Sequence, residues 1–570
     1  MERIIFILAA IIPSMGFGQN PLFVPDPLSG KSFSLSLQNG QVEFYPGFNT
    51  HTIGYNQDIL GPTLILEKGS NITFNVTNNL SEQTTLHWHG LHVPAADDGS
   101  PHTIIEPGQL WSPSFTILDK SATYWYHPHL HEQTEEQVTR GAAGFIIVRD
   151  DEEAQLILPR TYGVDDFPIA VQTRAFDANK EFLWNTTEDD IVMCNGTLDP
   201  VLDVPAQVIR LRLLNGSTQR VYNLGFEDDL IFFQIATDGG LLNAPVSLKR
   251  LRLAPGERAE VLLDLSTHQG QSFSFMSFAS ELPNGIYGAS NPSGHGSSGM
   301  MAGSISGYNN NSLNGNDFKI MQFQVSASTA NPIFTIPSTL TSNTPYAEPS
   351  ANNTREFYFQ SPHMGPQGML NGPFAINGQL FNLNVINHEI PLNNIEIWEL
   401  VNMTAISHPF HIHDVQFYIL DINGNPPPAN MQGRKDVVLV PPMFGTVRFI
   451  TKFEDFADEN APYMYHCHML NHEDGGMMGQ FVVVGTTTST TKGGENSILI
   501  YPNPVANLVH VQGLPNSTIR LQNLSGQLLE ERVSLGNEEQ FNLAEFASGI
   551  YYFNIRNAEQ NFTYKVIKYD

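Results

Sequence analysis

The chain has 570 residues and a formal net charge of -29 at pH 7, with 41% hydrophobic and 15% charged residues. This length exceeds what one hydrophobic core fills, so we expect three or four domains. The negative charge argues against nucleic acid and against an anionic membrane surface as partners, and it suits an exported protein.

The N-terminus carries a short apolar run. Residues 4–12 are apolar and follow a single arginine, and a small-residue sequence, Gly-Phe-Gly, stands at 16–18. The run is too short to span a bilayer and has the pattern of a secretory signal. We therefore predict a signal peptide at 1–18, no transmembrane segment in the mature protein, and a location outside the cell or on its surface.

Three segments of the chain repeat one pattern. With Gly 46 and Pro 37, and many runs rich in Val, Ile, Thr and Phe, the composition favours short strands and turns. Segments that start at residues 72, 209 and 395 each alternate apolar and polar residues and then reach an asparagine. The pattern predicts an all-β protein with three copies of one domain. We place these copies at 19–150, 151–330 and 331–485, the middle one being a spacer without metal ligands.

The C-terminal part is predicted to be separate. Residues 486–496 form a Thr- and Gly-rich stretch without apolar periodicity, which is typical of a linker. Residues 497–570 read as several short strands with Pro, Gly and Asn at the turns. They predict a small β-sandwich.

Metal-binding side chains concentrate in residues 465–479, which read YHCHMLNHEDGGMMG. Successive side chains of a strand point to opposite faces, so His466 and His468 share one face while Cys467 faces the other. One strand can therefore serve two metal sites, one on each side.

The cysteine side of this strand predicts a blue-copper site. Such a site needs two imidazoles and a weak axial ligand beside a thiolate, here that of Cys467. His472 and Met477 follow closely enough for the loop to fold back onto it. The second imidazole is assigned to His408, because its odd offset of three residues from His411 turns it toward the cysteine side.

The two cysteines are not expected to pair. An exported protein with two cysteines could form one disulfide. Coordination of a metal would keep Cys467 out of it, and Cys194 would remain as a small buried apolar residue.

The histidine side predicts a metal cluster. Four His-x-His pairs alternate along the strands of the first and third copies: His87 and His89, His127 and His129, His411 and His413, His466 and His468. A lone pair of this kind is usually a surface or core feature, but four in symmetric repeats beside a cysteine motif point to metal. Eight imidazoles suit two coppers with three each and one with two, with open positions that could receive dioxygen.

These motifs resemble those of multicopper oxidases of the three-cupredoxin-domain type. They stand here as HWHG, HPH, HPFHIH and HCHMLNHEDGGMM, and the likeness covers about residues 30–485. The resemblance implies three consecutive cupredoxin-like Greek-key β-barrels, to which the C-terminal β-sandwich is added. It also implies four copper ions: one type 1, one type 2 and a type 3 pair.

The resemblance assigns the ligands residue by residue. The positions that match the type 1 ligands are His408, Cys467, His472 and Met477. Those that match type 2 are His87 and His411, and those that match the type 3 pair are His89, His127 and His468 for one copper and His129, His413 and His466 for the other.

Two acids also match residues of the family. Asp98 and Glu473 resemble the carboxylates that feed protons to the oxygen cluster, which reduction of dioxygen to water requires. Carboxylates that only orient histidines are the alternative, a stronger one for Asp98 than for Glu473. Their neighbours Asp97 and Asp474 are expected to be solvated.

The implied activity is that of a laccase-like oxidase. A small reducing substrate, a phenol or an aromatic amine, would give single electrons at the edge of His472, and Cys467 would connect that site to the oxygen cluster. The closest likeness is to bacterial cuprous oxidases, but Thr404 and Ile406 stand where that branch has an Asp and a Met. Met364 and Met369 are read as ordinary loop residues.

Two alternatives remain open. One is a cuprous or ferrous ion oxidase for copper tolerance. The other, from a different class, is a non-catalytic copper-binding electron-transfer protein, which would have no use for eight further imidazoles. We expect a monomer.

The tail resembles a type IX secretion sorting domain. The features that carry this resemblance are YPNP, LAEFASGIYYFNI and TYKVIKY. It implies secretion machinery as a partner and passage across the outer membrane. A carbohydrate-binding or structural β-sandwich is the alternative.

Overall fold

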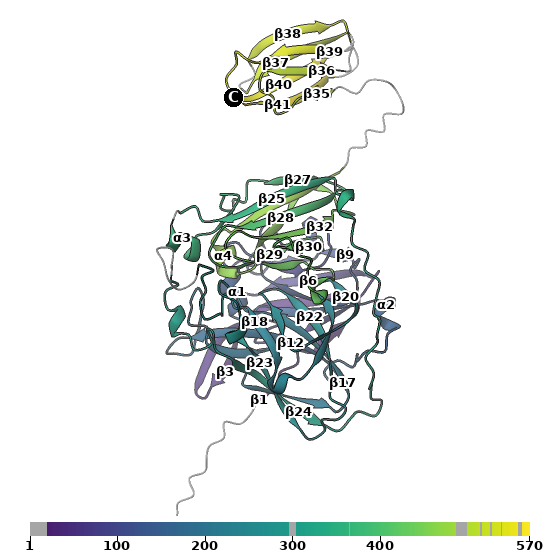
Figure 1. Ribbon diagram of the computed structural model, residues 1–570, viewed down its shortest axis with the longest axis vertical. Helices are drawn as coiled ribbons and strands as arrows, with labels where there is room; N and C mark the ends of the chain where they lie inside the picture. Colours follow the sequence, from purple (N-terminus) through teal and green to yellow (C-terminus); the bar gives the residue numbers. More distant parts are fainter. Residues whose placement is uncertain are drawn as a thin grey trace, which may run out of the picture. The chain divides into compact units, whose positions relative to one another are not determined.

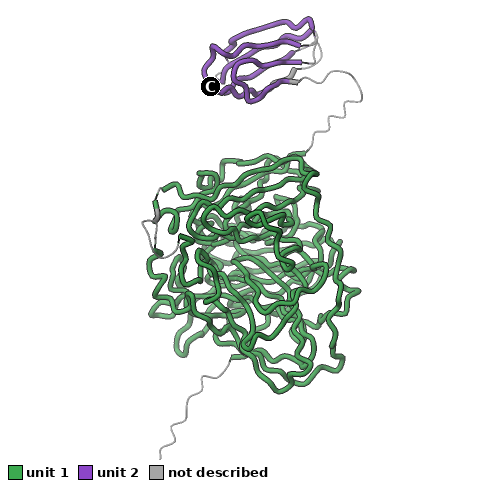
Figure 2. Tube along the Cα trace, viewed as in Figure 1, with its two compact units in different colours: residues 1–486 green, residues 487–570 purple. Residues whose placement is uncertain are grey.

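The computed structural model describes residues 20–295, 304–363, 365–485, 499–512, 516–524, 527–536, 538–556 and 561–569. The predicted signal peptide, the predicted linker and Met364 lie outside these ranges. The chain divides into two compact units, Met1–Thr486 and Thr487–Asp570 (Figure 2). Among the described residues, no helix has the length and apolar character that crossing a bilayer requires.

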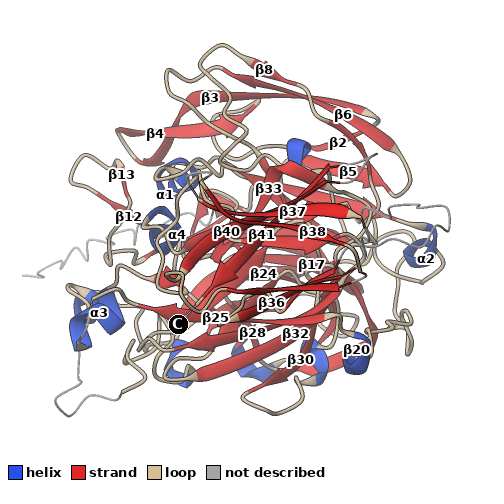
Figure 3. Cartoon of the chain, turned by 90° about the horizontal axis from the view of Figure 1, so that it is seen from above, coloured by secondary structure: helices blue, strands red, loops and turns tan. Residues whose placement is uncertain are grey.

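Strands dominate the larger unit (Figures 1 and 3), and its first pair of sheets shares a core in which Phe74 stacks on Trp88. One sheet has the order β2 (Pro27–Ser29), β5 (Thr63–Glu67), β11 (Gly144–Arg149), β10 (Ala122–His127), β7 (His87–His89). The other has the order β4 (Phe48–Tyr55), β3 (Ser32–Tyr45), β6 (Asn71–Asn78), β8 (Leu110–Trp111), with β9 (Ser114–Thr116) also on β6. Alternate residues of β6 are buried, which is the period of two that the sequence predicts.

The second pair of sheets has its own core. One sheet has the order β1 (Asn20–Pro21), β16 (Pro200–Pro205), β24 (Phe318–Ser326), β23 (Ser272–Ser277), β18 (Tyr222–Phe226), β21 (Leu251–Leu253). The other has the order β15 (Thr197–Leu198), β14 (Ile191–Cys194), β12 (Asp166–Phe176), β17 (Val208–Asn215), β22 (Arg258–Asp264), β19 (Phe232–Thr237), β20 (Gly240–Leu248), with β13 (Phe182–Leu183) on β12. The first strand of the described chain thus pairs with the second set of sheets rather than the first.

The third pair of sheets repeats the core pattern of the first, with Phe357 stacked on Trp398. One sheet has the order β26 (Ala375–Ile376), β25 (Asn353–Gln360), β28 (Ile395–Asn402), β32 (Gly445–Lys452), β30 (Tyr418–Ile422). The other has the order β27 (His388–Pro391), β34 (Met478–Val484), β33 (Asp458–Cys467), β29 (His408–Ile412), β31 (Val437–Val440).

Helices are short and lie between strands. The α-helices are α1 (Thr134–Thr139), α2 (Asp151–Ala154), α3 (Pro366–Asn371) and α4 (Leu470–Asp474). The 3-10 helices are η1 (Ala95–Asp97), η2 (Glu227–Asp229), η3 (Ala279–Glu281), η4 (Tyr308–Asn310), η5 (Glu348–Ser350) and η6 (Ala429–Met431). Two of them follow the histidine-bearing strands, α1 after β10 and α4 after β33, and these two helices contact each other.

The smaller unit consists of two sheets around one apolar core. Their orders are β35 (Leu499–Tyr501), β36 (Leu508–Gln512), β39 (Glu538–Asn542) and β38 (Leu528–Ser534), β37 (Ser517–Asn523), β40 (Gly549–Arg556), β41 (Asn561–Lys568). Both sheets contribute to that core, Val509 and Phe541 from one and Leu521 and Phe553 from the other. The predicted all-β class and the separate C-terminal β-sandwich are confirmed.

Candidate metal centre

Strand β33 separates two groups of potential ligands. It pairs with β29 so that Cys467 lies opposite Phe410 and His466 opposite His411. On one side, the Cys467 sulfur lies 3.4 Å from His408 Nδ1 and 3.6 Å from His472 Nδ1, and these two nitrogens are 3.2 Å apart. The cysteine and the two histidines assigned to it from the sequence therefore meet.

Met477 is held beside this group by the backbone. Its side chain is fully buried. The Cys467 N–H donates to the Met477 carbonyl at 3.0 Å, and the Met477 N–H donates to the His472 carbonyl at 2.9 Å. The chain therefore folds back after α4, as the spacing of these residues predicts.

Thr404 orients the first histidine of this group. Its hydroxyl oxygen lies 2.8 Å from His408 Nε2, on the edge of the ring opposite to the cysteine. A proton on Nε2 leaves the Nδ1 lone pair facing the Cys467 sulfur. Thr404 is fully buried, and Ile406 beside it is also buried.

The eight histidines of the four His-x-His pairs gather on the other side of β33, and all of them are buried. Ligand atoms within 4.8 Å of one another form three histidine groups: His87, His411 and His413; His89, His127 and His468; His129, His413 and His466. Ring nitrogens approach to 3.1 Å between His129 and His466, and to 3.4 Å both between His89 and His127 and between His413 and His466. The two outer strand sets, separated by the whole second pair of sheets in the sequence, thus contribute jointly.

Burial favours the neutral form of six of these imidazoles. Burial, and after it the neighbouring His87, lower the pKa of His413 to about 3. The pKa values of five others lie well below the usual range for the same reason, with neighbouring imidazoles adding to the effect: His89, His127, His129, His411 and His468. Neutral imidazoles offer the lone pairs that a metal needs.

Asp98 contacts one histidine from each outer strand set. Its carboxylate lies 2.7 Å from His413 Nδ1 and 3.3 Å from His87 Nδ1. Burial by itself would raise the pKa of Asp98, but the two imidazoles outweigh it and the pKa falls below its usual value. The His413 Nδ1–H can donate to the carboxylate, and the His87 Nδ1–H can donate to the Asp98 backbone carbonyl at 3.0 Å, which turns both Nε2 atoms toward the cluster.

Glu473 also contacts one histidine from each outer strand set, His129 and His466. Its two oxygens lie 3.4 Å from His129 Nδ1 and 3.1 Å from His466 Nδ1. Burial would raise the pKa of Glu473, but these histidines outweigh it and lower the pKa. These contacts also allow an orienting role for Glu473, but the geometry supports that role more strongly for Asp98, which forms a 2.7 Å hydrogen bond with His413 Nδ1.

Asp436 is a third such acid, and it was missed in the sequence. Its carboxylate lies 3.2 Å from His89 Nε2 and 3.7 Å from His411 Nδ1, which also contacts the Asp436 carbonyl at 2.9 Å. The signal that could have revealed it is a charged pair, Lys435 and Asp436, directly before the apolar sequence VVLV of β31.

Asp474 differs from expectation. It was predicted to be solvated, but it is half-buried and its carboxylate accepts the N–H groups of Thr134 at 3.0 Å and Glu135 at 2.8 Å. The reason is the contact of α4 with the first turn of α1, whose free N–H groups need acceptors. Asp97 is partly exposed.

The residues present fit copper. His87 Nε2, His411 Nε2 and both ring nitrogens of His468 are buried without a hydrogen-bond partner. Such orphaned groups are costly in a protein interior, and a cation among neutral nitrogens removes that cost. On the other face of β33, a thiolate together with imidazoles is a ligand set that copper favours. Both cysteines are free and buried, as predicted.

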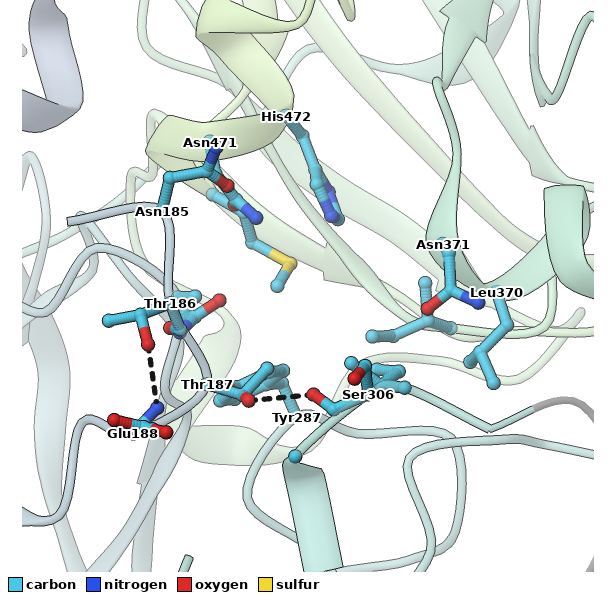
Figure 4. A pocket seen from close by; sticks show the side chains of 15 residues that line it. Asn185, Thr186, Thr187, Glu188, Tyr287, Ser306, Leu370, Asn371, Asn471 and His472 are labelled. Atoms are coloured by element: carbon cyan, nitrogen blue, oxygen red, sulfur yellow. Dashed lines mark hydrogen bonds between the residues drawn. The ribbon is translucent and has the colours of Figure 1, made fainter.

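A cavity of about 380 Å³ opens at the half-buried His472 (Figure 4). The His472 ring points into it, and Met469 also contributes to its wall. Amide and hydroxyl side chains make up much of the rest: Asn185, Thr186, Thr187, Ser306, Asn371 and Asn471. Glu188 is an exposed carboxylate at the same cavity.

Family models match three parts of the chain. Residues 36–153 and 322–486 match two models that are both described as multicopper oxidase. Residues 499–569 match a model described as a secretion system C-terminal sorting domain.

Named relatives match over most of their length. The multicopper oxidase mco of Staphylococcus haemolyticus is 34% identical over 483 residues, which is 82% of this chain and 93% of the relative. The cell division protein FtsP of Escherichia coli is 30% identical over 473 residues, with the same coverage of 82% and 93%.

Solved structures show the same likeness. The laccase-like multicopper oxidase CueO from Ochrobactrum sp. has a TM-score of 0.71 and 32% identity, covering 81% of this chain and all of that one (100%). A multicopper oxidase from Campylobacter jejuni, described as a metallo-oxidase, has a TM-score of 0.68 and 26% identity, covering 82% of this chain and 96% of that one.

Proposed function

The chain belongs to the multicopper oxidase family of copper-containing oxidoreductases that use oxygen, and from this premise we propose that it couples oxidation of phenols and aromatic amines to reduction of dioxygen to water. Its cupredoxin-like fold is that of the family. The C-terminal sorting domain indicates export to the cell surface.

The proposed cofactor content is four coppers. The cysteine group with Met477 would hold the type 1 copper, His87 and His411 the type 2 copper, and the two remaining groups of three histidines the type 3 pair. When bound, copper would take single electrons from the substrate and supply four of them to dioxygen.

The observation that carries this proposal is the position of Cys467. Its side chain contacts His408 and His472. Its two neighbours in the sequence, His466 and His468, belong to the buried histidine groups on the other face of β33. The polypeptide itself therefore joins a site next to a cavity with a site that is closed to solvent. A non-catalytic carrier would need only the first of these.

The cavity at His472 supports organic substrates. Its amide and hydroxyl groups can hydrogen-bond a phenol or an aromatic amine, and the Glu188 carboxylate can accept from either. At the two positions where cuprous oxidases have an Asp and a Met, Thr404 and Ile406 are buried, and the Thr404 hydroxyl is engaged by His408. These residues do not offer a substrate metal ion any ligand.

A metal-ion oxidase is the second candidate. Met469 lines the cavity beside His472, and a thioether is a ligand that Cu(I) favours. A soft ligand next to the site of oxidation is the specific feature of this cavity that favours Cu(I), and Fe(II) belongs to the same alternative.

The buried carboxylates would transfer protons to the oxygen site. Asp98 and Glu473 lie within 3.4 Å of the Nδ1 atoms of four histidines, two each, so each could exchange a proton beside the oxygen site. Asp474 follows Glu473 and reaches the first turn of α1, which extends the chain of carboxyl groups away from the cluster.

Export would use both ends of the chain. We propose that residues 1–18 act as a signal peptide and that the sorting domain is recognised by secretion machinery, leaving a monomeric enzyme with domains at 19–150, 151–330 and 331–485.

The test combines copper analysis with steady-state kinetics. Fully loaded protein should bind four coppers per chain, show the blue thiolate-to-copper band, and oxidise a phenol and an aromatic amine without added copper. The same assay with Cu(I) and Fe(II), with and without added copper, tests the alternative. One copper per chain would rule out the cluster, and activity that appears only with metal ions would replace organic substrates by metal ions.

A further inference from the structure

A turn of the second pair of sheets reaches the buried histidine groups. It joins β21 to β22 and contains Gly256, and Arg258 follows it as the first residue of β22. Arg258 is 1% exposed and forms two 2.6 Å hydrogen bonds with the two oxygens of Asp436. No residue of 151–330 stands in the histidine groups within the described part of the chain, so this contact is of another kind.

Every donor of the Arg258 guanidinium is used. Besides its two bonds to Asp436, it donates to the carbonyl oxygens of Thr123, Gly256 and Asp238, each at 3.1 Å. A guanidinium has five N–H groups in a rigid plane, so these five acceptors determine its position fully. The arginine thereby joins all three pairs of sheets, through Thr123 on β10, its own strand β22, and Asp436 beside β31.

Asp436 transmits this position to two histidines. Its carboxylate contacts His89 from the first pair of sheets and His411 from the third. The opposite nitrogens of these rings face the cluster: His89 Nδ1 lies 3.4 Å from His127, and His411 Nε2 has no hydrogen-bond partner. His89 contacts the Asp436 carboxylate at 3.2 Å, and His411 Nδ1 also contacts the Asp436 backbone carbonyl at 2.9 Å, so two different histidine groups depend on one residue, whose carboxylate is held by Arg258.

Gly256 adds a third histidine. Its φ of +82° disfavours other residues, and a Cβ there would lie 2.9 to 3.0 Å from ring atoms of His468. The turn therefore presses its backbone against that ring. His468 has no hydrogen bond to either ring nitrogen, so this packing contact limits where the ring can go.

We propose that Arg258 is a positioning residue of the copper cluster, so that the middle domain controls cluster assembly without supplying a ligand. The inference rests on the proposed function, since it presumes that the histidine groups bind copper. This role differs from that of a spacer, because a spacer could be any well-packed domain at 151–330 that separates the two outer domains. The type 1 site should be independent of Arg258, because none of the contacts of this arginine reaches Cys467, His408 or His472.

The experiment uses Arg258→Lys with a matched control. Lysine keeps the charge but cannot make the forked pair with Asp436. The control is Arg212→Lys: Arg212 is equally buried, forms ion pairs with Asp166 and Glu260, and contacts Thr123 through its side chain. Both changes disturb a buried arginine at the same junction, but the ion pairs of Asp166 and Glu260 in the described part of the chain include no histidine, whereas Asp436 contacts two.

The readouts are copper content, chelator competition, the type 2 electron paramagnetic resonance signal and the blue band. Arg258→Lys should lower the affinity of the cluster for copper about 10- to 100-fold, the range for residues that hold metal ligands, and weaken the type 2 signal. The blue band should remain, and Arg212→Lys should keep both signals. Asp436→Asn should reproduce the loss and serves as the second variant if Arg258→Lys does not fold.

The inference is overturned if both variants at the Arg258–Asp436 pair keep wild-type affinity and signals, or if Arg212→Lys loses cluster copper equally. An absence of cluster copper in the wild-type chain would instead refute the proposed function, so the two failures are distinguishable.

Discussion

Two regions of the chain, β10 with α1 and β33 with α4, have the same construction and different chemistry. The first histidine of a His-x-His pair lies at or next to the end of each strand, and each strand is followed by a short helix. Each also has a tyrosine opposite a glycine of the next strand, Tyr126 with Gly144 and Tyr465 with Gly479. In both places a methyl group on the glycine would collide with the tyrosine ring.

The regions differ on the face that points away from the cluster. Pro128 stands in the first pair where Cys467 stands in the second, and Gln133 stands five residues later where the second region has His472. Thr84, three residues before His87, occupies the place that His408 has before His411, and it donates to Gln137 at 2.8 Å. The common strand construction therefore places histidines of the cluster in both regions, while His408, Cys467 and His472 are the side chains, together with Met477, that distinguish the region that also forms the cysteine site.

The largest effect is expected at the cysteine. Cys467→Ser should abolish the blue colour and the oxidase activity, because serine cannot supply a thiolate, and it should keep much of the cluster copper held on the opposite face of β33. Absorption spectra, copper analysis and steady-state rates measure this. Cys194→Ser, at the other buried free cysteine, is the control and should keep the colour. Loss of all copper in Cys467→Ser would mean that the two faces are not independent.

A smaller effect is expected from Glu473→Gln. Glu473 lies in α4, and no proton donor is proposed in the region of β10 and α1. The amide keeps the shape but cannot titrate, so turnover should fall about ten- to a thousandfold, at the lower end of general acid catalysis. The blue band and its reduction by substrate should persist, because the cysteine group is unchanged.

The measurement separates the two roles of Glu473. The variant is reduced without air, mixed with dioxygen and followed by its copper spectra. Slow reoxidation at full copper content supports proton transfer. Loss of cluster copper would indicate that the carboxylate only orients His129 and His466, and wild-type turnover would exclude both.

The smallest effect is expected from paired glycine substitutions. Gly144→Ala and Gly479→Ala should each lower the free energy of unfolding by about 1–3 kcal/mol, the cost of overpacking against a fixed ring. Thermal unfolding of the copper-free protein measures both. Gly485→Ala, where an added methyl meets nothing within 4 Å, should be close to neutral. If only one of the pair is destabilised, the two strands are not equivalent in packing.

Much of the site could be predicted because strand geometry is local. Alternation along a strand places His466 and His468 opposite to Cys467 whatever the rest of the fold does. The offsets of His408 and His472 follow from the same rule and from the length of the intervening loop. The internal repeat, and the resemblance of its motifs to a family, then connected the local pairs to one another.

The acids could be predicted only in part, because a carboxylate acts through its neighbours in space. Asp98 and Glu473 can be identified from matched motifs. The sequence does not show that each acid contacts two histidines, one from the first pair of sheets and one from the third. The sequence predicts a solvated Asp474 because nothing in its own segment reveals that the first turn of α1 lies beside it.

The sequence by itself determined which side chains share a strand face, and thereby that a cysteine site and a histidine cluster lie back to back on β33. Only the tertiary structure decided how the second pair of sheets takes part. Arg258 is far in sequence from both Asp436 and Thr123, and no periodicity signals a contact among them. The physical reason is that a side chain's direction follows from its own backbone, whereas its partner depends on how separate domains pack.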